Sequence, residues 1–185
     1  GKTELAYYVA QNVQSAFPDG QILVSLRGAS INPLSPEQAL QSIIRAIKPR
    51  AEVSETLPET LSALQAVYRT LLNGKRVFIL ADDAANVSQV EPLLPPAGNS
   101  LLVTSRMRFV LPGMDSKSLD VLSVEQSVDL LRRIAPRVGR YATILATLCG
   151  HLPLALRLAG TYLATYRDQS LQEYIQKLNQ SPLKW

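Results

Sequence analysis

The sequence is poor in cysteine, histidine and charged residues. Of its 185 residues only one is cysteine and one is histidine, and 18% are charged. The single cysteine, Cys149, excludes an internal disulfide and fits a reducing compartment, so we expect a cytoplasmic protein. Its apolar sequence neighbours predict that Cys149 packs in a core.

The sequence also lacks long apolar runs, internal repeats and low-complexity segments. No run approaches the roughly 20 residues that cross a membrane, so no membrane partner is expected. The net charge of +4 is scattered, and the nearest thing to a basic patch is Arg132-Arg133 with Arg137 and Arg140. This pattern favours a solvated helix face over direct nucleic-acid binding. The length suits one α/β domain or a small domain with a helical annex.

The central feature of the sequence is an apolar run that ends in two acids. Val77 to Ala81 are uncharged and largely β-forming, and Asp82 and Asp83 follow directly. This pattern predicts a parallel strand buried on both faces, with the acids at its carboxyl end, where open α/β sheets bind ligands. A divalent cation with its phosphate ligand would compensate the paired carboxylates; a solvated strand end is the alternative.

Two further segments have the character of strands, at 21–27 and 100–105, and 119–122 has that of a weak edge strand. Helical patterns separate the strands, so we expect 21–27, 76–81 and 100–105 to be mutually parallel.

The period of the apolar residues changes along the chain. Ser35 to Gln38 and Ser123 to Gln126 are capping-box patterns that predict helix starts, and from Ser123 the pattern is helical to the end. We therefore predict an α/β domain over 1–122 and an all-helical one over 123–185.

The first three residues, Gly1-Lys2-Thr3, lead directly into a helical pattern. They match the last three positions of the phosphate-binding loop G-x-x-x-x-G-K-[ST], in which the lysine reaches phosphates and the hydroxyl ligates magnesium. A cloning glycine followed by an unrelated Lys-Thr pair is the alternative. The motif interpretation predicts that the first half of the loop and the strand before it lie outside this chain.

Four motifs in order carry a resemblance to a known family. They are Gly1-Lys2-Thr3, Phe78-Ile-Leu-Ala-Asp82-Asp83, Leu102-Val-Thr-Ser-Arg106 and Cys149-Gly-His-Leu-Pro-Leu-Ala-Leu156. With this spacing the chain resembles the NB-ARC branch of the STAND nucleotide-binding switches over nearly its whole length, and bacterial members found in large multidomain regulators in particular. The resemblance implies a three-layer α/β P-loop NTPase fold whose parallel sheet lacks its first strand, followed by an ARC1-like all-helical subdomain.

The resemblance also implies roles for the residues of the first two motifs. Gly1, Lys2 and Thr3 would be the end of Walker A, binding the phosphates of ATP or ADP, with Thr3 also on Mg²⁺. Asp82 would be the Walker B acid that holds Mg²⁺, and Asp83 would orient the attacking water.

The last two motifs carry the remaining roles. Arg106 would face the γ-phosphate, and Pro153 would pack near the adenine. His151 departs from the family, because glycine usually occupies its position. We do not expect His151 to act in catalysis, since no nucleophile accompanies it.

The implied function is an ATP/ADP-binding signalling switch within a larger regulatory protein, reset by slow Mg²⁺-dependent ATP hydrolysis. Its partners would be nucleotide, effector and sensor or repeat domains of the same protein, and further copies of itself on activation. The alternatives are a scaffold that has lost turnover and the ATPase part of a transcriptional regulator. In the family's strand order, the missing strand would leave a gap beside the strand that ends near Arg106.

Overall fold

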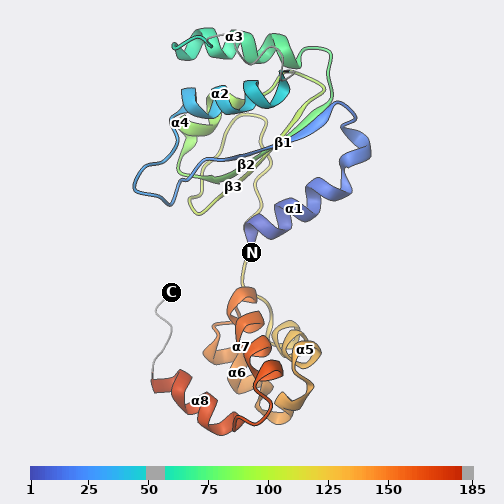
Figure 1. Cartoon of the computed structure of the whole chain (residues 1–185), viewed down its shortest axis with the longest axis vertical. Coiled ribbons are helices and arrows are strands. Elements are labelled where there is room, and N and C mark those ends of the chain that lie inside the picture. Colours follow the sequence, from blue (N-terminus) through green and yellow to red (C-terminus); the bar gives the residue numbers. More distant parts are fainter. Residues whose placement is uncertain (49–56, 181–185) are drawn as a thin grey trace. The chain divides into compact units, whose positions relative to one another are not determined.

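The computed structural model describes residues 1–48 and 57–180 and divides the chain into two compact units. One unit is Lys2–Lys117, and the other is Ser118–Trp185 together with Gly1. Figure 1 shows that the first contains the sheet and the second is helical. The division falls between Lys117 and Ser118, whereas the prediction set the boundary between 122 and 123.

The first unit is built on a parallel sheet of three strands. They are β1 (Gly20–Ser25), β2 (Val77–Ala84) and β3 (Ser100–Ser105), in the spatial order β1-β2-β3. Both neighbouring pairs are parallel, as predicted, and β2 lies in the centre. Its residues from Val77 to Ala81 are all buried, which agrees with their continuous apolar pattern.

One face of the sheet is covered by α2 (Pro36–Ile47) and α3 (Leu61–Leu72) (Figure 1). Helix α2 begins at the predicted capping box: the Ser35 side chain accepts from Gln38 N, and the Gln38 side chain accepts from Ser35 N. Alternate β2 residues face this layer, and the short α4 (Val87–Val90) borders it. The large hydrophobic core of the unit therefore lies on this side.

The opposite face carries α1 (Lys2–Asn12), which Figure 1 shows across the sheet from α2 and α3. Its contacts are sparser, because Ala6 is the one buried residue of the helix. Ala6 packs with Phe78 and Leu80, the β2 residues that point away from α2 and α3. Helices, sheet and helix form the three layers of an α/β P-loop NTPase-like fold.

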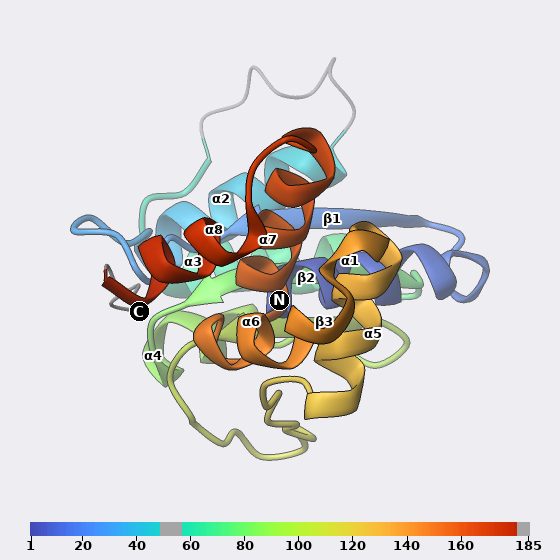
Figure 2. The same cartoon turned by 90° about the horizontal axis from the view of Figure 1, so that it is seen from below.

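The described residues of the second unit, 118–180, form four α-helices: α5 (Val124–Ile134), α6 (Ala142–Leu148), α7 (Pro153–Thr165) and α8 (Leu171–Gln180) (Figure 2). A 3₁₀ segment, Pro136–Tyr141, joins α5 to α6. The helices share a core that includes Leu131, Leu145 and Leu156, each fully buried. No helix in the described part of the chain is long and apolar enough to cross a membrane.

The predicted edge strand at 119–122 is wrong. This segment has no regular structure, and Leu122 N donates to His151 O of the helical unit at 3.0 Å. The backbone groups of a strand bond to a neighbouring strand, whereas the N–H group of Leu122 bonds to the turn between α6 and α7. The alternating pattern of Leu119 to Leu122 does not mark sheet pairing, since Leu119 and Val121 are exposed.

Element boundaries also differ from the prediction. Strand β1 ends at Ser25 rather than at residue 27. Strand β2 continues to Ala84 rather than ending before the acids, because a β-bulge between Ala81 and Ala84 carries the pairing with β3 past them. The apolar pattern after Pro58 also predicts a helix from about that residue, and α3 begins later, at Leu61.

Candidate functional site

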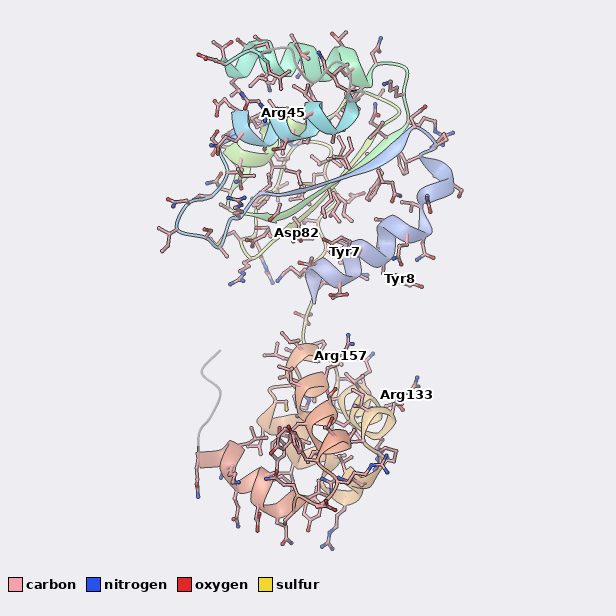
Figure 3. All side chains as sticks on the ribbon, in the orientation of Figure 1. Tyr7, Tyr8, Arg45, Asp82, Arg133 and Arg157 are labelled. Atoms are coloured by element: carbon pink, nitrogen blue, oxygen red, sulfur yellow. The ribbon has the colours of Figure 1, made fainter. Side chains whose placement is uncertain are left out.

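A pocket of about 380 Å³ lies at the carboxyl ends of β2 and β3. It combines strand ends with the first turn of α1 and is lined by Lys2, Thr3, Ser25, Asp82, Asp83, Thr104, Ser105 and Arg106. Five of the seven predicted site residues therefore meet at one place. Figure 3 labels Asp82 on the side of the sheet that faces α1.

Asp82 is held by two threonine hydroxyls from distant parts of the chain. Its Oδ1 accepts from Thr3 Oγ1 at 2.9 Å and from Thr104 Oγ1 at 2.5 Å. Thr3 belongs to the first turn of α1 and Thr104 to β3, so three elements fix the orientation of this carboxylate. No described residue donates to its second oxygen, which leaves Oδ2 free to bind a ligand.

Asp83 has an unusual backbone conformation. Its φ is +58°, in the left-handed region that few residues other than glycine adopt. The bulge produces this turn, and Asp83 N donates to Thr104 Oγ1 at 2.9 Å. Backbone strain of this kind collects at functional sites. As a result, the side chains of Asp82 and Asp83 both line the pocket, although the two residues are adjacent in a strand.

The Asp83 carboxylate has partners on two sides. Its Oδ2 accepts from Ala29 N at 3.0 Å, and its Oδ1 lies 3.9 Å from Arg106 Nε. The Arg106 side chain is 78% exposed, so this ion pair is weak. Arg106 can therefore turn toward a ligand at small cost.

The loop after β1 reaches the site through a glycine. Gly28 N donates to Asp83 O, and a Cβ on Gly28 would lie 2.4 Å from Ala85 N. Only a residue without a side chain allows the two backbones to approach so closely. This approach brings Ala29 N to Asp83.

The amino end of α1 adds positive potential to the pocket. Lys2 and Thr3 form its first turn, whose backbone N–H groups have no partner within the helix. A lysine, an arginine and a helix amino end around two carboxylates suit an anion bound together with a cation.

The oxygen atoms of the site fit Mg²⁺. Across residues 1–48 and 57–180 no cluster of three or more His, Cys, Asp or Glu side chains could hold a metal ion. A metal at this pocket would therefore take the Asp82 carboxylate, the Thr3 hydroxyl, water and phosphate oxygens. Mg²⁺ binds in that way, through one or two protein carboxylates with water and phosphate completing its shell.

Two predicted site residues are not among the pocket's lining residues. Gly1 is exposed, and Pro153 is the half-buried first residue of α7 in the helical unit. Sequence reasoning gave no role to Thr104, Ser25 or Ser105. Thr104 could have been found, because it is a hydroxyl residue at the end of a predicted parallel strand, two positions before Arg106.

His151 has a structural position. Its φ is +55°, which explains why glycine suits this place in the family motif. The ring Nδ1 lies 3.0 Å from Oγ of Ser127, a fully buried residue whose hydroxyl donates to Ser123 O. His151 thus joins the turn before α7 to the start of α5.

Comparison with known proteins finds relatives among regulators. The chain is 42% identical over 185 residues to the regulatory protein AfsR of Streptomyces griseus and 40% identical to that of Streptomyces coelicolor, in each case over 96% of this chain. It spans only 19% and 18% of the length of those two proteins. It is also 28% identical, over 67% of its length, to the probable disease resistance protein RF45 of Arabidopsis thaliana. No family model matches the chain.

Proposed function

We propose that this chain is the nucleotide-binding module of an NB-ARC-type STAND switch in a larger regulatory protein, and that it binds ATP and ADP with Mg²⁺. The observation that carries the proposal is the Asp82 carboxylate held between Thr3 and Thr104 beside Arg106 and the amino end of α1. The similarity to segments of two regulatory proteins and to a disease resistance protein supports it.

In this proposal the pocket residues that bind the nucleotide and its metal are Lys2, Thr3, Asp82 and Arg106. Lys2 and the first-turn amides of α1 bind phosphate oxygens, and Thr3 and Asp82 hold the metal, whose charge offsets that of the phosphates. Arg106 leaves its exposed pairing with Asp83 and turns its guanidinium to the terminal phosphate. Pro153 contacts the adenine from the helical unit.

Hydrolysis is the finer part of the proposal. Asp83 would orient the attacking water through Oδ1, the carboxylate oxygen that is released when Arg106 moves to phosphate. Slow turnover would then reset the switch. A scaffold without turnover is the second candidate, because Ala29 N and Arg106 together engage both carboxylate oxygens of Asp83.

Calorimetric titration with Mg²⁺-ATP and Mg²⁺-ADP tests the binding proposal. The 185-residue chain should bind weakly, and a version that begins upstream and completes the phosphate loop should bind at least about tenfold more tightly. Equal affinities would count against the assignment of Gly1 to Thr3. Asp82→Asn should remove the Mg²⁺ dependence while preserving the fold, since asparagine keeps the acceptor for both hydroxyls. Ser42→Ala, an exposed site on α2 outside the pocket, is the control.

Asp83→Asn separates the switch from the scaffold. In the longer version it should preserve Mg²⁺-ATP binding and slow phosphate release by about 100-fold, if water is activated there. A wild-type protein that binds Mg²⁺-ATP and releases no phosphate would instead establish the scaffold.

Arg106 and Pro153 should act on different parts of the nucleotide. Arg106→Ala should weaken Mg²⁺-ATP more than Mg²⁺-ADP, because only ATP carries the terminal phosphate. Pro153→Ala should weaken both equally, because both carry adenine. Unchanged discrimination between the two nucleotides in Arg106→Ala would refute its role as a phosphate sensor.

A further inference from the structure

Gln89 is a buried polar residue that the proposed nucleotide chemistry does not use. It lies on the short helix α4, and only 4% of its surface is exposed. Burying an amide is unfavourable unless each of its polar atoms has a partner. The partners of Gln89 therefore indicate what the residue does.

Those partners come from two loops at the same edge of the sheet. Gln89 Nε2 donates to Leu26 O at 2.8 Å and to Leu34 O at 2.7 Å, while its Oε1 accepts from Ala85 N at 2.8 Å. Leu26 and Leu34 are the two ends of the loop between β1 and α2, and Ala85 directly follows β2. One side chain thus ties the base of the first loop to the end of the strand that carries the acids.

The loop held in this way, residues 26–34, is the one that contacts Asp83. Leu34 N also donates to Leu26 O at 3.0 Å and closes the base of the loop. Beyond that base, Gly28 N donates to Asp83 O and Ala29 N to Asp83 Oδ2. Gln89 therefore holds both ends of a loop whose backbone N–H groups bond to Asp83.

We propose that Gln89 is a positioning residue: by closing the 26–34 loop against β2, it keeps Ala29 N–H on Asp83 and so sets the orientation of that carboxylate. Its direct effect is on the loop and on Asp83, whatever the pocket binds. Its effect on turnover rests on the proposed function.

The first test needs no ligand. In the unchanged 185-residue chain, hydrogen exchange measured by NMR should be at least about tenfold slower for the side-chain amide of Gln89 than for that of Gln65. Gln65 is the matched comparison, because it is half-buried and has one bond, to Pro92 O at 3.4 Å. Exchange of the Gln89 amide as fast as that of Gln65 would overturn the proposal.

The second test removes the amide. Gln89→Met should speed exchange of Ala29 N by about tenfold and shift the carboxyl ¹³C resonance of Asp83. Gln65→Met should do neither. If Gln89→Met instead speeds exchange of every amide in the unit equally, the residue contributes only to general stability and the proposal is wrong.

Gln89→Glu is a variant that can be titrated. An ionised carboxylate cannot donate to Leu26 O or Leu34 O, whereas the neutral acid can donate to one of them. Protection of Ala29 N, corrected for intrinsic exchange, should fall as the introduced carboxyl group ionises. Protection that does not change with pH in this variant would contradict the proposal.

The nucleotide assay distinguishes the two proposals. In the longer, nucleotide-binding version, Gln89→Met should slow phosphate release while leaving the Mg²⁺-ATP dissociation constant within about twofold. If no version binds nucleotide, the proposed function fails, and the exchange measurements still decide the role of Gln89.

Discussion

The two units of this protein use their polar side chains in different ways. In the α/β unit, hydrogen bonds join residues far apart in the sequence: Thr3 and Asp82 are separated by 79 positions, and Gln89 and Leu26 by 63. In the helical unit most are local, such as the reciprocal capping box of Ser123 and Gln126. Local hydrogen bonds cap helix ends, whereas hydrogen bonds between distant residues hold polar side chains from different elements together. The pocket accordingly lies in the α/β unit.

Arg137 is the main exception in the helical unit. Its guanidinium donates to backbone oxygens of Leu163, Tyr166, Arg167 and Gln169, around the end of α7. It satisfies carbonyls that the helix itself leaves without partners. In this unit, a side chain that is distant in the sequence caps a helix end and does not form part of a binding site.

The largest effect is expected when Arg137 is replaced. Arg137→Met should lower the free energy of unfolding by about 3 kcal/mol, because bonds to a charged group are lost and carbonyl groups lose their donor. Urea unfolding followed by circular dichroism measures it. Arg133→Met removes an exposed ion pair with Asp129 and should cost less than about 0.5 kcal/mol. If both variants lose the same free energy of unfolding, Arg137 contributes no more to stability than an exposed ion pair does.

A smaller effect is expected from a matched pair of glycine substitutions. Gly28→Ala should destabilise by about 2 kcal/mol, because the new Cβ would meet backbone atoms that cannot rotate away. In Gly160→Ala the nearest atoms are Cγ2 and Cβ of Ile134 at 3.0 and 3.1 Å. A small shift of α5 away from α7 relieves these contacts, and alanine also favours the helix. Its free energy of unfolding should therefore change by less than about 1 kcal/mol. If Gly160→Ala lowered the free energy of unfolding more than Gly28→Ala, the packing between α5 and α7 would tolerate an added methyl group less well than the contact between Gly28 and Ala85.

The smallest effect concerns pH. Burial raises the pKa of the Cys149 thiol to about 11. Because the folded pKa lies above the unfolded value, the folded chain retains the proton longer, and stability falls as pH rises from about 9 toward 11. The contribution lost between about pH 9 and 10 should be about 1 kcal/mol.

Cys149→Ala should flatten this alkaline decline, which urea unfolding at each pH measures. Burial also raises the pKa of Tyr174, so Tyr174→Phe is the control for tyrosine ionisation. If Cys149→Ala declines as steeply as the wild type, the thiol makes no such contribution.

The sequence predicted what depends on local pattern. The burial of β2, the capping boxes at Ser35 and Ser123 and the parallel orientation of the strands follow from periodicity, caps and connections. The strand expected at 119–122 failed because pairing depends on a neighbour, and alternating residues alone do not supply one.

The candidate site was predictable to the same extent. Lys2, Thr3, Asp82, Asp83 and Arg106 stood in motifs, and the structure brings them to one pocket. Gln89 and Gly28 gave no such signal, because their importance arises only when two loops meet. The left-handed turn at Asp83 depends on the bulge against β3, which no local pattern encodes.

The bond between His151 and Ser127 has a consequence for the side chain that this turn requires. The Ser127 hydroxyl gives its only proton to Ser123 O, so Nδ1 of His151 must be the donor in their contact. Glycine would suit the left-handed backbone at this position, but it would leave the buried Ser127 oxygen without that donor.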